Sequence, residues 1–262
     1  MNDPYDAIEN IGELYDSITL YRSRSDIAFY VDEARNAKGK VLEIGCGTGR
    51  VLIPAARDGV EITGVDRSSP MLDRCKERVA AEPAEVRARI TLHQADMRSF
   101  DLGRLFALAM VPFRPMQHLI TIDDQMSALN AISRHLEPKG RLVFDVFSPD
   151  LRLLADPTRV EEREEMPETP LGDGRTLRRT SRVNAVHTLD QYSEIELIYY
   201  VQYPDGRSER LVQSFPMRWY MKAEVDHLLA RCGLRVVDTY GNFDRSPASD
   251  ESPEMIFIAE RA

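Results

Sequence analysis

Residues 41–49 decide the fold of this chain, and they read Val41-Leu42-Glu43-Ile44-Gly45-Cys46-Gly47-Thr48-Gly49. The mostly aliphatic residues at 41–44 predict a short buried strand, and the glycines that follow predict a tight loop. Glycine tolerates positive φ angles and lets a ligand approach the backbone, while the start of the next helix offers free N–H groups to an anion. The stretch therefore predicts a ligand-binding loop between a strand and a helix, although such a loop can also be only a tight turn.

Helices and strands alternate after this loop. Predicted helices cover residues 50–58, 69–81, 122–136 and 223–232, and predicted strands cover 61–65, 90–92, 105–111, 142–147, 234–240 and 255–259. Ser69-Pro70 marks the start of the second helix, with Ser69 as its N-cap and proline in the first turn. The alternation predicts an α/β fold, namely a doubly wound, mainly parallel, seven-stranded Rossmann-like sheet.

The pattern changes at about residue 148. Long β-like segments at 177–187, 194–203 and 207–217 follow an acidic stretch, and Asp205-Gly206 is typical of a hairpin turn. We therefore expect an inserted antiparallel sheet over residues 148–217, after the fifth strand. Residues 1–147 and 218–262 would then form the main domain, and the insert would serve as a substrate lid or a dimerisation element.

The composition of the chain limits the kinds of partner that it is expected to bind. The chain has 262 residues and a formal net charge of −9, which disfavours unaided binding to a phosphate backbone and favours a small-molecule substrate over nucleic acid. No stretch approaches the roughly 20 apolar residues that span a bilayer, so we expect no membrane partner. The first residues are acidic where a secretory signal would be basic, which predicts a cytoplasmic location. The three cysteines show no spacing typical of disulfides or zinc, so we predict no metal site.

Asp66 lies at the end of the second predicted strand, somewhat fewer than the roughly 20 residues after the glycine loop that are expected in a β-α-β unit. A carboxylate at this place can accept both ribose hydroxyls of an adenosine cofactor. Nicotinamide cofactors use the same arrangement, but their loop reads G-x-G-x-x-G, and here Arg50 and Val51 follow Gly49 without a further glycine. A NAD-dependent oxidoreductase is therefore the less favoured hypothesis.

Four motifs in order make the chain resemble class I S-adenosylmethionine-dependent methyltransferases: residues 41–49, 63–72, 94–97 and 136–142. The resemblance implies S-adenosyl-L-methionine as cofactor and S-adenosyl-L-homocysteine as product. It assigns the methionine part to the backbone of the glycine loop, the ribose to Asp66, and the adenine to Asp96 and Met97. The full set of expected cofactor-binding residues is Gly45, Cys46, Gly47, Gly49, Asp66, Arg67, Met71, Asp96, Met97 and Tyr15.

A looser similarity to glycine N-methyltransferase and amino-sugar N,N-dimethyltransferases rests on the predicted insert, which in those enzymes covers the substrate. This chain departs from many relatives after its fourth strand, where Ala109-Met110-Val111-Pro112-Phe113 lacks both an acidic residue and an Asn-Pro-Pro-aromatic element. The departure speaks against an adenine or glutamine amide methyltransferase. It also motivates the alternative of a non-catalytic S-adenosylmethionine-binding or regulatory protein. The favoured hypothesis is methyl transfer to N, O or C of a small metabolite.

Two residues are candidates for catalysis. His118 follows the fourth strand and could act as a general base, unless its ring is simply satisfied by backbone groups. Tyr21, like Tyr15, lies in an N-terminal segment expected to close over the cofactor, where packing alone is the alternative. Arg24 or Arg50 could bind the methionine carboxylate.

Other polar and aromatic residues of the insert have simpler interpretations. The arginines at 175, 178, 179 and 182 are expected to pair with the glutamates at 161, 162, 164 and 165 across strands. Phe215, Trp219 and Tyr220 could line a substrate pocket, or they could only pack at the junction between insert and main domain.

Overall fold

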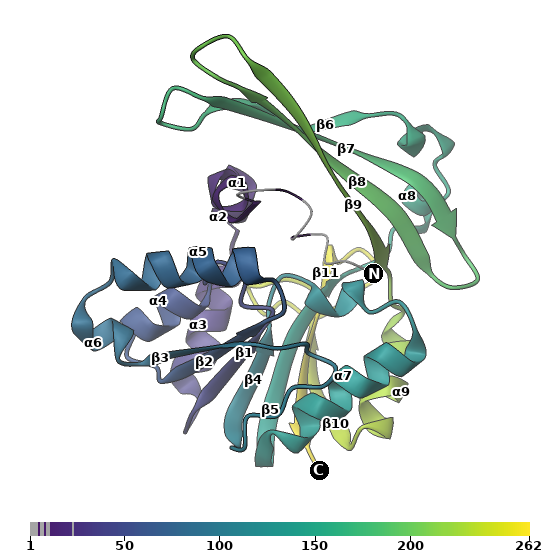
Figure 1. Cartoon of the computed structure of the whole chain (residues 1–262). Helices are drawn as coiled ribbons and strands as arrows, with labels where there is room; N and C mark the ends of the chain where they lie inside the picture. Colours follow the sequence, from purple (N-terminus) through teal and green to yellow (C-terminus); the bar gives the residue numbers. More distant parts are fainter. Residues whose placement is uncertain (1–4, 6–7, 9–10, 23) are drawn as a thin grey trace.

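The computed structural model describes residue 5, residue 8, residues 11–22 and residues 24–262, and Figure 1 shows their arrangement. A main domain contains a seven-stranded sheet, and a separate four-stranded sheet lies above it. We call the four-stranded sheet the cap sheet. The N-terminal helices α1 (Ile11–Ser17) and α2 (Thr19–Arg22), which we call the N-terminal strap, lie between the two.

The main sheet has the strand order β10-β11-β5-β4-β1-β2-β3. Its strands are β1 (Val41–Ile44), β2 (Ile62–Asp66), β3 (Ile90–Gln94), β4 (Phe106–Val111), β5 (Leu136–Phe147), β10 (Leu234–Tyr240) and β11 (Glu254–Arg261). Strands β1 to β5 pair in parallel, whereas β11 pairs antiparallel with both β5 and β10. The predicted seven-stranded, mainly parallel sheet is confirmed. The order reverses between β1 and β4, which places a crevice beyond their carboxyl ends.

Helices cover both faces of this sheet. They are α3 (Asp26–Asn36), α4 (Leu52–Arg57), α5 (Ser69–Ala80), α6 (Ala84–Arg87), α7 (Ile122–Arg134) and α9 (Lys222–Arg231), with the 3-10 helix η1 (Pro115–His118) after β4. Successive strand residues point to opposite faces, so Leu42 packs in the core that contains α7 and α9, whereas Val41 packs in the core that contains α3, α4 and α5. Strands buried on both faces explain their near-continuous apolar sequences.

The cap sheet has the order β6-β7-β8-β9 and is antiparallel throughout. Its strands are β6 (Arg163–Pro170), β7 (Thr176–His187), β8 (Tyr192–Gln202) and β9 (Ser208–Arg218), preceded by α8 (Leu151–Leu154) and η2 (Pro157–Val160). One face of β8 carries Leu197, Tyr199 and Val201, which pack against Ile11, Leu14 and Ile18 of the N-terminal strap. The predicted insert is confirmed as a sheet, and the strap fills the space beneath it.

Several boundaries differ from the sequence-based expectation. Strand β6 was not predicted, because its sequence Arg-Glu-Glu-Met-Pro-Glu-Thr-Pro does not alternate; as an edge strand with register shifts, it tolerates proline and charge. Strand β5 begins at Leu136, with a shift in its pairing to β4 near Lys139, which has a φ of 64°. The N-cap of α5 is Ser68, one residue earlier than predicted.

Candidate functional site

One large cavity, of approximately 770 Å³, opens beyond the carboxyl ends of the parallel strands and extends beneath the cap sheet. Its size is typical of small-molecule sites. One part, the glycine-loop end, is lined by residues of the main domain such as Gly45, Gly47, Asp66, Arg67, Met71, Asp96 and Met97. The other part, the cap-sheet end, is lined by Asn184, Tyr192, Glu194, Ile195, Ser214, Phe215 and Pro216. A single space therefore connects the main domain with the cap sheet.

The glycine loop is fixed by its own backbone. The N–H groups of Gly45 and Cys46 donate to the carbonyl oxygen of Val65 at 2.8 and 3.1 Å, which ties the loop to the end of β2. Gly45 and Gly47 have φ angles of 70° and 52°, and a Cβ atom at Gly45 would lie 2.7 Å from Cγ of Pro115. Position 45 thus requires glycine for both conformation and space.

Asp66, the last residue of β2, accepts hydrogen bonds from the glycine loop and from the start of α5. Its Oδ2 accepts from the Gly47 N–H at 2.7 Å, and its Oδ1 accepts from the Ser68 N–H at 2.9 Å. Each carboxylate oxygen carries two lone pairs and can accept more than one hydrogen bond, and Asp66 also lines the cavity. Asp66 therefore couples the shape of the glycine loop to ligand binding.

Asp96 lies in the loop after β3 and is paired with Arg98, whose Nη2 is 2.6 Å from Asp96 Oδ2. The side-chain hydrogen bonds from Arg98 lower the pKa of Asp96, so this carboxyl is a permanent acceptor at neutral pH. Arg98 also binds Asp124 of α7 at 2.8 Å, and Met97 lines the same cavity. The wall here combines charge with an apolar surface, as an adenosine group requires.

The N-terminal strap closes one side of the cavity. Tyr15 of the strap and Tyr5, which precedes the strap, line the cavity, whereas Tyr21 is not among the lining residues. The ring centroid of Tyr21 lies 4.8 Å from that of Tyr15, so Tyr21 stands behind the wall. Asp16 anchors the strap to the glycine loop, because its Oδ1 accepts from the Thr48 hydroxyl at 2.7 Å.

His118 lies where the two ends of the cavity meet. It is the last residue of η1, and its ring centroid is 5.3 Å from that of Phe215 in β9. The preceding residue, Gln117, is fully buried: its Nε2 donates to the Arg218 carbonyl at 2.5 Å, and its Oε1 accepts from the Phe147 N–H at 3.0 Å. Gln117 therefore fixes η1 between the ends of β5 and β9, a role that the sequence did not indicate.

Two expected cofactor residues, Cys46 and Gly49, do not line the cavity. Cys46 is buried, and burial raises the pKa of its thiol well above the ordinary value, so it remains protonated. At Gly49, where φ is 81°, a Cβ atom would lie 2.8 Å from Sγ of Cys75. The structure places both residues where they shape the loop from behind.

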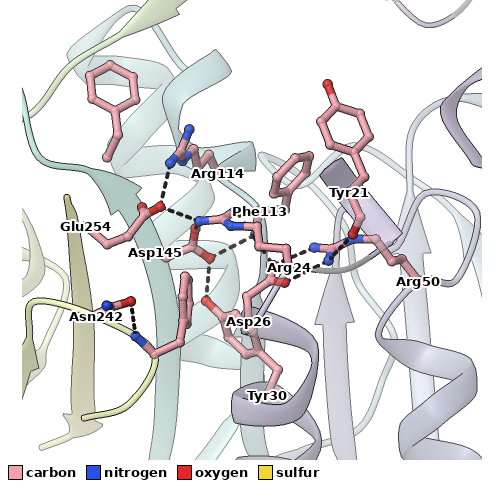
Figure 2. Close-up of polar contacts among 12 residues, drawn as sticks. Tyr21, Arg24, Asp26, Tyr30, Arg50, Phe113, Arg114, Asp145, Asn242 and Glu254 are labelled. Carbon is pink, nitrogen blue, oxygen red and sulfur yellow. Dashed lines mark hydrogen bonds and ion pairs between the residues drawn. The ribbon is translucent and has the colours of Figure 1, made fainter. Parts of the chain in front are cut away.

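Arg24 and Arg50, considered for binding a carboxylate, also lie outside the cavity lining. Figure 2 shows both in a buried network of charged side chains. Arg50 donates to both carboxylate oxygens of Asp26 at 2.8 and 2.6 Å, and Arg24 donates to Glu254 at 2.5 Å. Asp145 accepts from the Tyr30 hydroxyl at 2.7 Å in the same network. These pairs join the start of α3 to β5 and β11 and satisfy charges that would be costly to bury alone.

Two of the four arginines of the basic cluster pair with the expected glutamates across β6 and β7, and the other two have different partners. Arg179 lies 2.8 Å from Glu165, and Arg178 lies 4.0 Å from Glu164. Arg182 instead pairs with Glu196 of β8 at 2.7 Å, and Arg175 pairs with Glu13 of the strap.

The three aromatic residues near the junction of the cap sheet and the main domain do not line one common pocket. Phe215 lines the main cavity, Trp219 lines a smaller one, and the Tyr220 hydroxyl donates to the Met116 carbonyl at 2.9 Å.

Asn184 reaches the cavity because of an irregularity that the sequence did not reveal. In the β7–β8 ladder Val183 pairs with Ile195 and Ala185 pairs with Glu194, which leaves Asn184 as the extra residue of a bulge. Bulges of this kind redirect side chains near functional sites. No local pattern marks Asn184, because a bulge is defined by the pairing of two strands.

The described residues contain no group of three His, Cys, Asp or Glu side chains arranged for a metal ion. None of the helices that they form has the length and apolar character that crossing a membrane requires. The main cavity nevertheless fits the cofactor implied by the motifs: it offers a cradle that only glycine permits at position 45, and carboxylates at Asp66 and Asp96.

Comparisons with known proteins agree with this geometry. A family model described as "Methyltransferase domain" matches residues 41–140. The cypemycin N-terminal methyltransferase of a Streptomyces species is 25% identical over 264 residues, which cover 100% of both chains. The dTDP-3-amino-3,4,6-trideoxy-alpha-D-glucopyranose N,N-dimethyltransferase of Streptomyces venezuelae is 30% identical over 139 residues, or 51% of this chain and 55% of that enzyme.

A solved structure shows the same fold. CalS10, an amino pentose methyltransferase from Micromonospora echinaspora solved with S-adenosylmethionine bound, has a TM-score of 0.71 at 23% identity, covering 95% of this chain and 97% of that one. The strand order, the glycine loop and the family model favour a methyltransferase over an oxidoreductase. Residues 41–140 match the methyltransferase domain family, and the chain is an S-adenosylmethionine-dependent methyltransferase.

Proposed function

We propose that this enzyme methylates an amine nitrogen of a small polar molecule that binds at the cap-sheet end of the cavity. The observation that carries the proposal is the continuity of the cavity from Gly45 and Asp66 to Ser214 and Phe215. A cofactor at one end and an acceptor at the other can then meet near His118. The approximately 770 Å³ volume accommodates both.

At the glycine-loop end, we assign the cofactor contacts to residues that line the cavity. Asp66 accepts the ribose hydroxyls, Asp96 and Met97 hold the adenine, and the backbone at Gly45 and Gly47 receives the methionine part. Arg67, Met71 and Tyr15 complete this surface. Cys46 and Gly49 support the loop from behind. When bound, S-adenosylmethionine supplies an activated methyl group for in-line displacement.

At the acceptor, the residues of the chain have two tasks. They hold the nucleophile in line with the methyl group, and they exclude water, both of which are provided by a cap sheet and strap closed over the cavity. An amine arrives largely as an ammonium ion and must lose a proton before it attacks. His118 is the half-buried base placed where the two ends meet, and we propose that its ring accepts this proton.

The names of the relatives support nitrogen as the acceptor atom. The curated relatives described above include an amino-sugar N,N-dimethyltransferase and an N-terminal methyltransferase, and CalS10 acts on an amino pentose. The carboxylate of Glu194 at the cap-sheet end adds a negative charge suited to a cationic group. A hydroxyl or carbon acceptor carries no positive charge for this carboxylate to attract.

The test is an acceptor panel with labelled S-adenosylmethionine. The panel should pair amino sugars, short peptides with a free N-terminus and simple amines with matched compounds in which a hydroxyl replaces the amine. Mass spectrometry should find methylated products only for amines, and the His118→Gln variant should form them more slowly. Methylation of the hydroxyl compounds alone would contradict nitrogen specificity.

Assembly and location complete the proposal. We infer that nucleic acid is not the acceptor because of the net charge of −9, that two copies associate through the cap sheet, and that the enzyme works in the cytoplasm. Light scattering of the purified chain tests the dimer, and cell fractionation tests the location. A monomeric mass at micromolar concentrations would contradict the dimer.

A further inference from the structure

Arg179 is a buried arginine on the face of the cap sheet that meets the N-terminal strap. Its exposed fraction is 3%, and it lies on β7 two residues after Leu177, which packs against the strap. Its Nη1 donates to the Tyr21 hydroxyl at 2.5 Å, and its guanidinium carbon is 4.9 Å from the centre of the Tyr21 ring. Burying an arginine is costly unless specific partners compensate. Arg179 has two such partners, Glu165 of β6 at 2.8 Å and Tyr21 of the strap, and only Tyr21 connects it to the main domain side of the cavity.

Tyr21 contacts Arg179 on one side and two residues of the cavity wall on the other. Its ring centroid lies 4.8 Å from that of Phe113 and 4.8 Å from that of Tyr15. Phe113 and Tyr15 both line the cavity. The Tyr21 side chain thus lies between Arg179 of the cap sheet and the two cavity-lining residues Phe113 and Tyr15.

The segment that carries Phe113 depends on outside support. Phe113 and Arg114 have φ angles of 65° and 73°, a left-handed conformation that costs roughly 1–3 kcal/mol at a non-glycine residue. The Phe113 N–H donates to Asp145 at 2.8 Å, and the guanidinium groups of Arg24 and Arg50 lie 4.9 and 4.7 Å from its ring centre. Figure 2 shows Phe113 among these residues, with Tyr21 nearby. Several partners therefore hold a strained backbone in place.

We propose that Arg179 is a positioning residue: by holding Tyr21, it seats Tyr15 and Phe113 so that the cavity wall is complete only when the cap sheet is docked on the strap. The ion pair of Arg175 with Glu13 joins the same two elements nearby. The cap sheet then does more than cover the acceptor. Its position also affects how Tyr15 and Phe113 line the cavity near the glycine loop. The proposal rests on the proposed function only for its effect on turnover.

The test compares Arg179→Gln, Tyr21→Phe and the double variant with Arg182→Gln as control. Arg182 lies on the same strand and pairs with Glu196, but its side chain is 38% exposed. Amide hydrogen exchange, measured with S-adenosylhomocysteine bound, should become faster over residues 112–118 in both single variants and stay unchanged in the control. This readout needs no methyl acceptor, so it remains decisive even if amine methylation fails.

Kinetics supply the second readout. Each single variant should lower kcat/KM by at least about tenfold, since small misplacements of a cavity wall are costly. The kcat/KM of the double variant should lie within about twofold of that of the more impaired single variant, because both single changes remove the same hydrogen bond between Arg179 and Tyr21. Arg179→Lys, which keeps the charge, should recover part of the activity and guards against misfolding of Arg179→Gln. Unchanged exchange at 112–118, fully additive losses, or equal effects of Arg182→Gln would each overturn the proposal.

Discussion

The two ends of the cavity are built in different ways. At the glycine-loop end, backbone groups set the shape: the Gly45 and Cys46 N–H groups bind one carbonyl, and Asp66 holds Gly47. At the cap-sheet end, side chains such as Phe215 and Ser214 form the wall. Backbone geometry changes little with substitution, whereas side chains change freely. We therefore expect cofactor binding to depend mainly on the fold, and acceptor choice to depend on the side chains of the cap sheet.

The largest effect is expected at Asp66. The Asp66→Ala variant removes an ionised acceptor that also orders the loop, and hydrogen bonds to charged groups contribute roughly 1.5–3 kcal/mol each, so S-adenosylhomocysteine should bind at least about a hundredfold more weakly. Calorimetry measures this. Asp73→Ala, an exposed position in α5, is the control and should bind normally. Wild-type affinity in a folded Asp66→Ala protein would show that the glycine-loop end does not depend on this carboxylate.

The next effect is expected at His118, where the two ends meet. His118→Gln removes a base but keeps a polar side chain, so kcat should fall by about a hundredfold while cofactor affinity is retained. His227→Gln, on the exposed side of α9, is the matched control. A kcat within twofold of the wild type would assign His118 to packing.

A smaller effect is expected at Phe215 and should be confined to the cap-sheet end. Phe215→Ala removes apolar contact area, and the KM for the acceptor should rise by about tenfold, in line with the burial energy of one aromatic side chain. S-adenosylhomocysteine affinity should not change. Leu189→Ala, at an exposed turn of the same sheet, should alter neither value. If Phe215→Ala weakened cofactor binding equally, the division between the two ends would be wrong.

The last prediction concerns stability and not ligand binding, at Glu43, which is buried in β1 directly before the glycine loop. Burial raises the pKa of Glu43 from 4.5 to about 8. Between these values the unfolded chain has lost the proton and the folded chain retains it, so stability contributed by this group is present at low pH and falls as the pH rises. The slope is at most about 1.4 kcal/mol per pH unit. Denaturant unfolding of Glu43→Gln from pH 5 to pH 8 should lack this slope, and an identical slope in both proteins would contradict the assignment.

Local sequence predicted the main sheet well because its signals lie within short stretches. The stretch 41–49 and the acidic residue Asp66 belong to neighbouring strands of the chain and the loops that follow them. The hydrogen bond that joins Gly47 to Asp66 spans 19 residues. Strand β6 escaped prediction because an edge strand needs no alternating pattern. Tyr21 was predicted as a candidate for catalysis, yet it lies behind the cavity wall, and sequence alone could not distinguish a tyrosine facing a ligand from one facing an arginine.

The sequence by itself determined the fold class, the glycine loop and the residues expected to hold the cofactor, because strand, loop and helix propensities act over a few neighbouring residues. Only the tertiary structure decided which distant residues meet around the cavity. Arg179 and Tyr21 are 158 residues apart in the chain, and Gln117 and Arg218 are 101 apart. Such contacts are set by how whole sheets pack and by a bulge at Asn184, and no local propensity encodes either one.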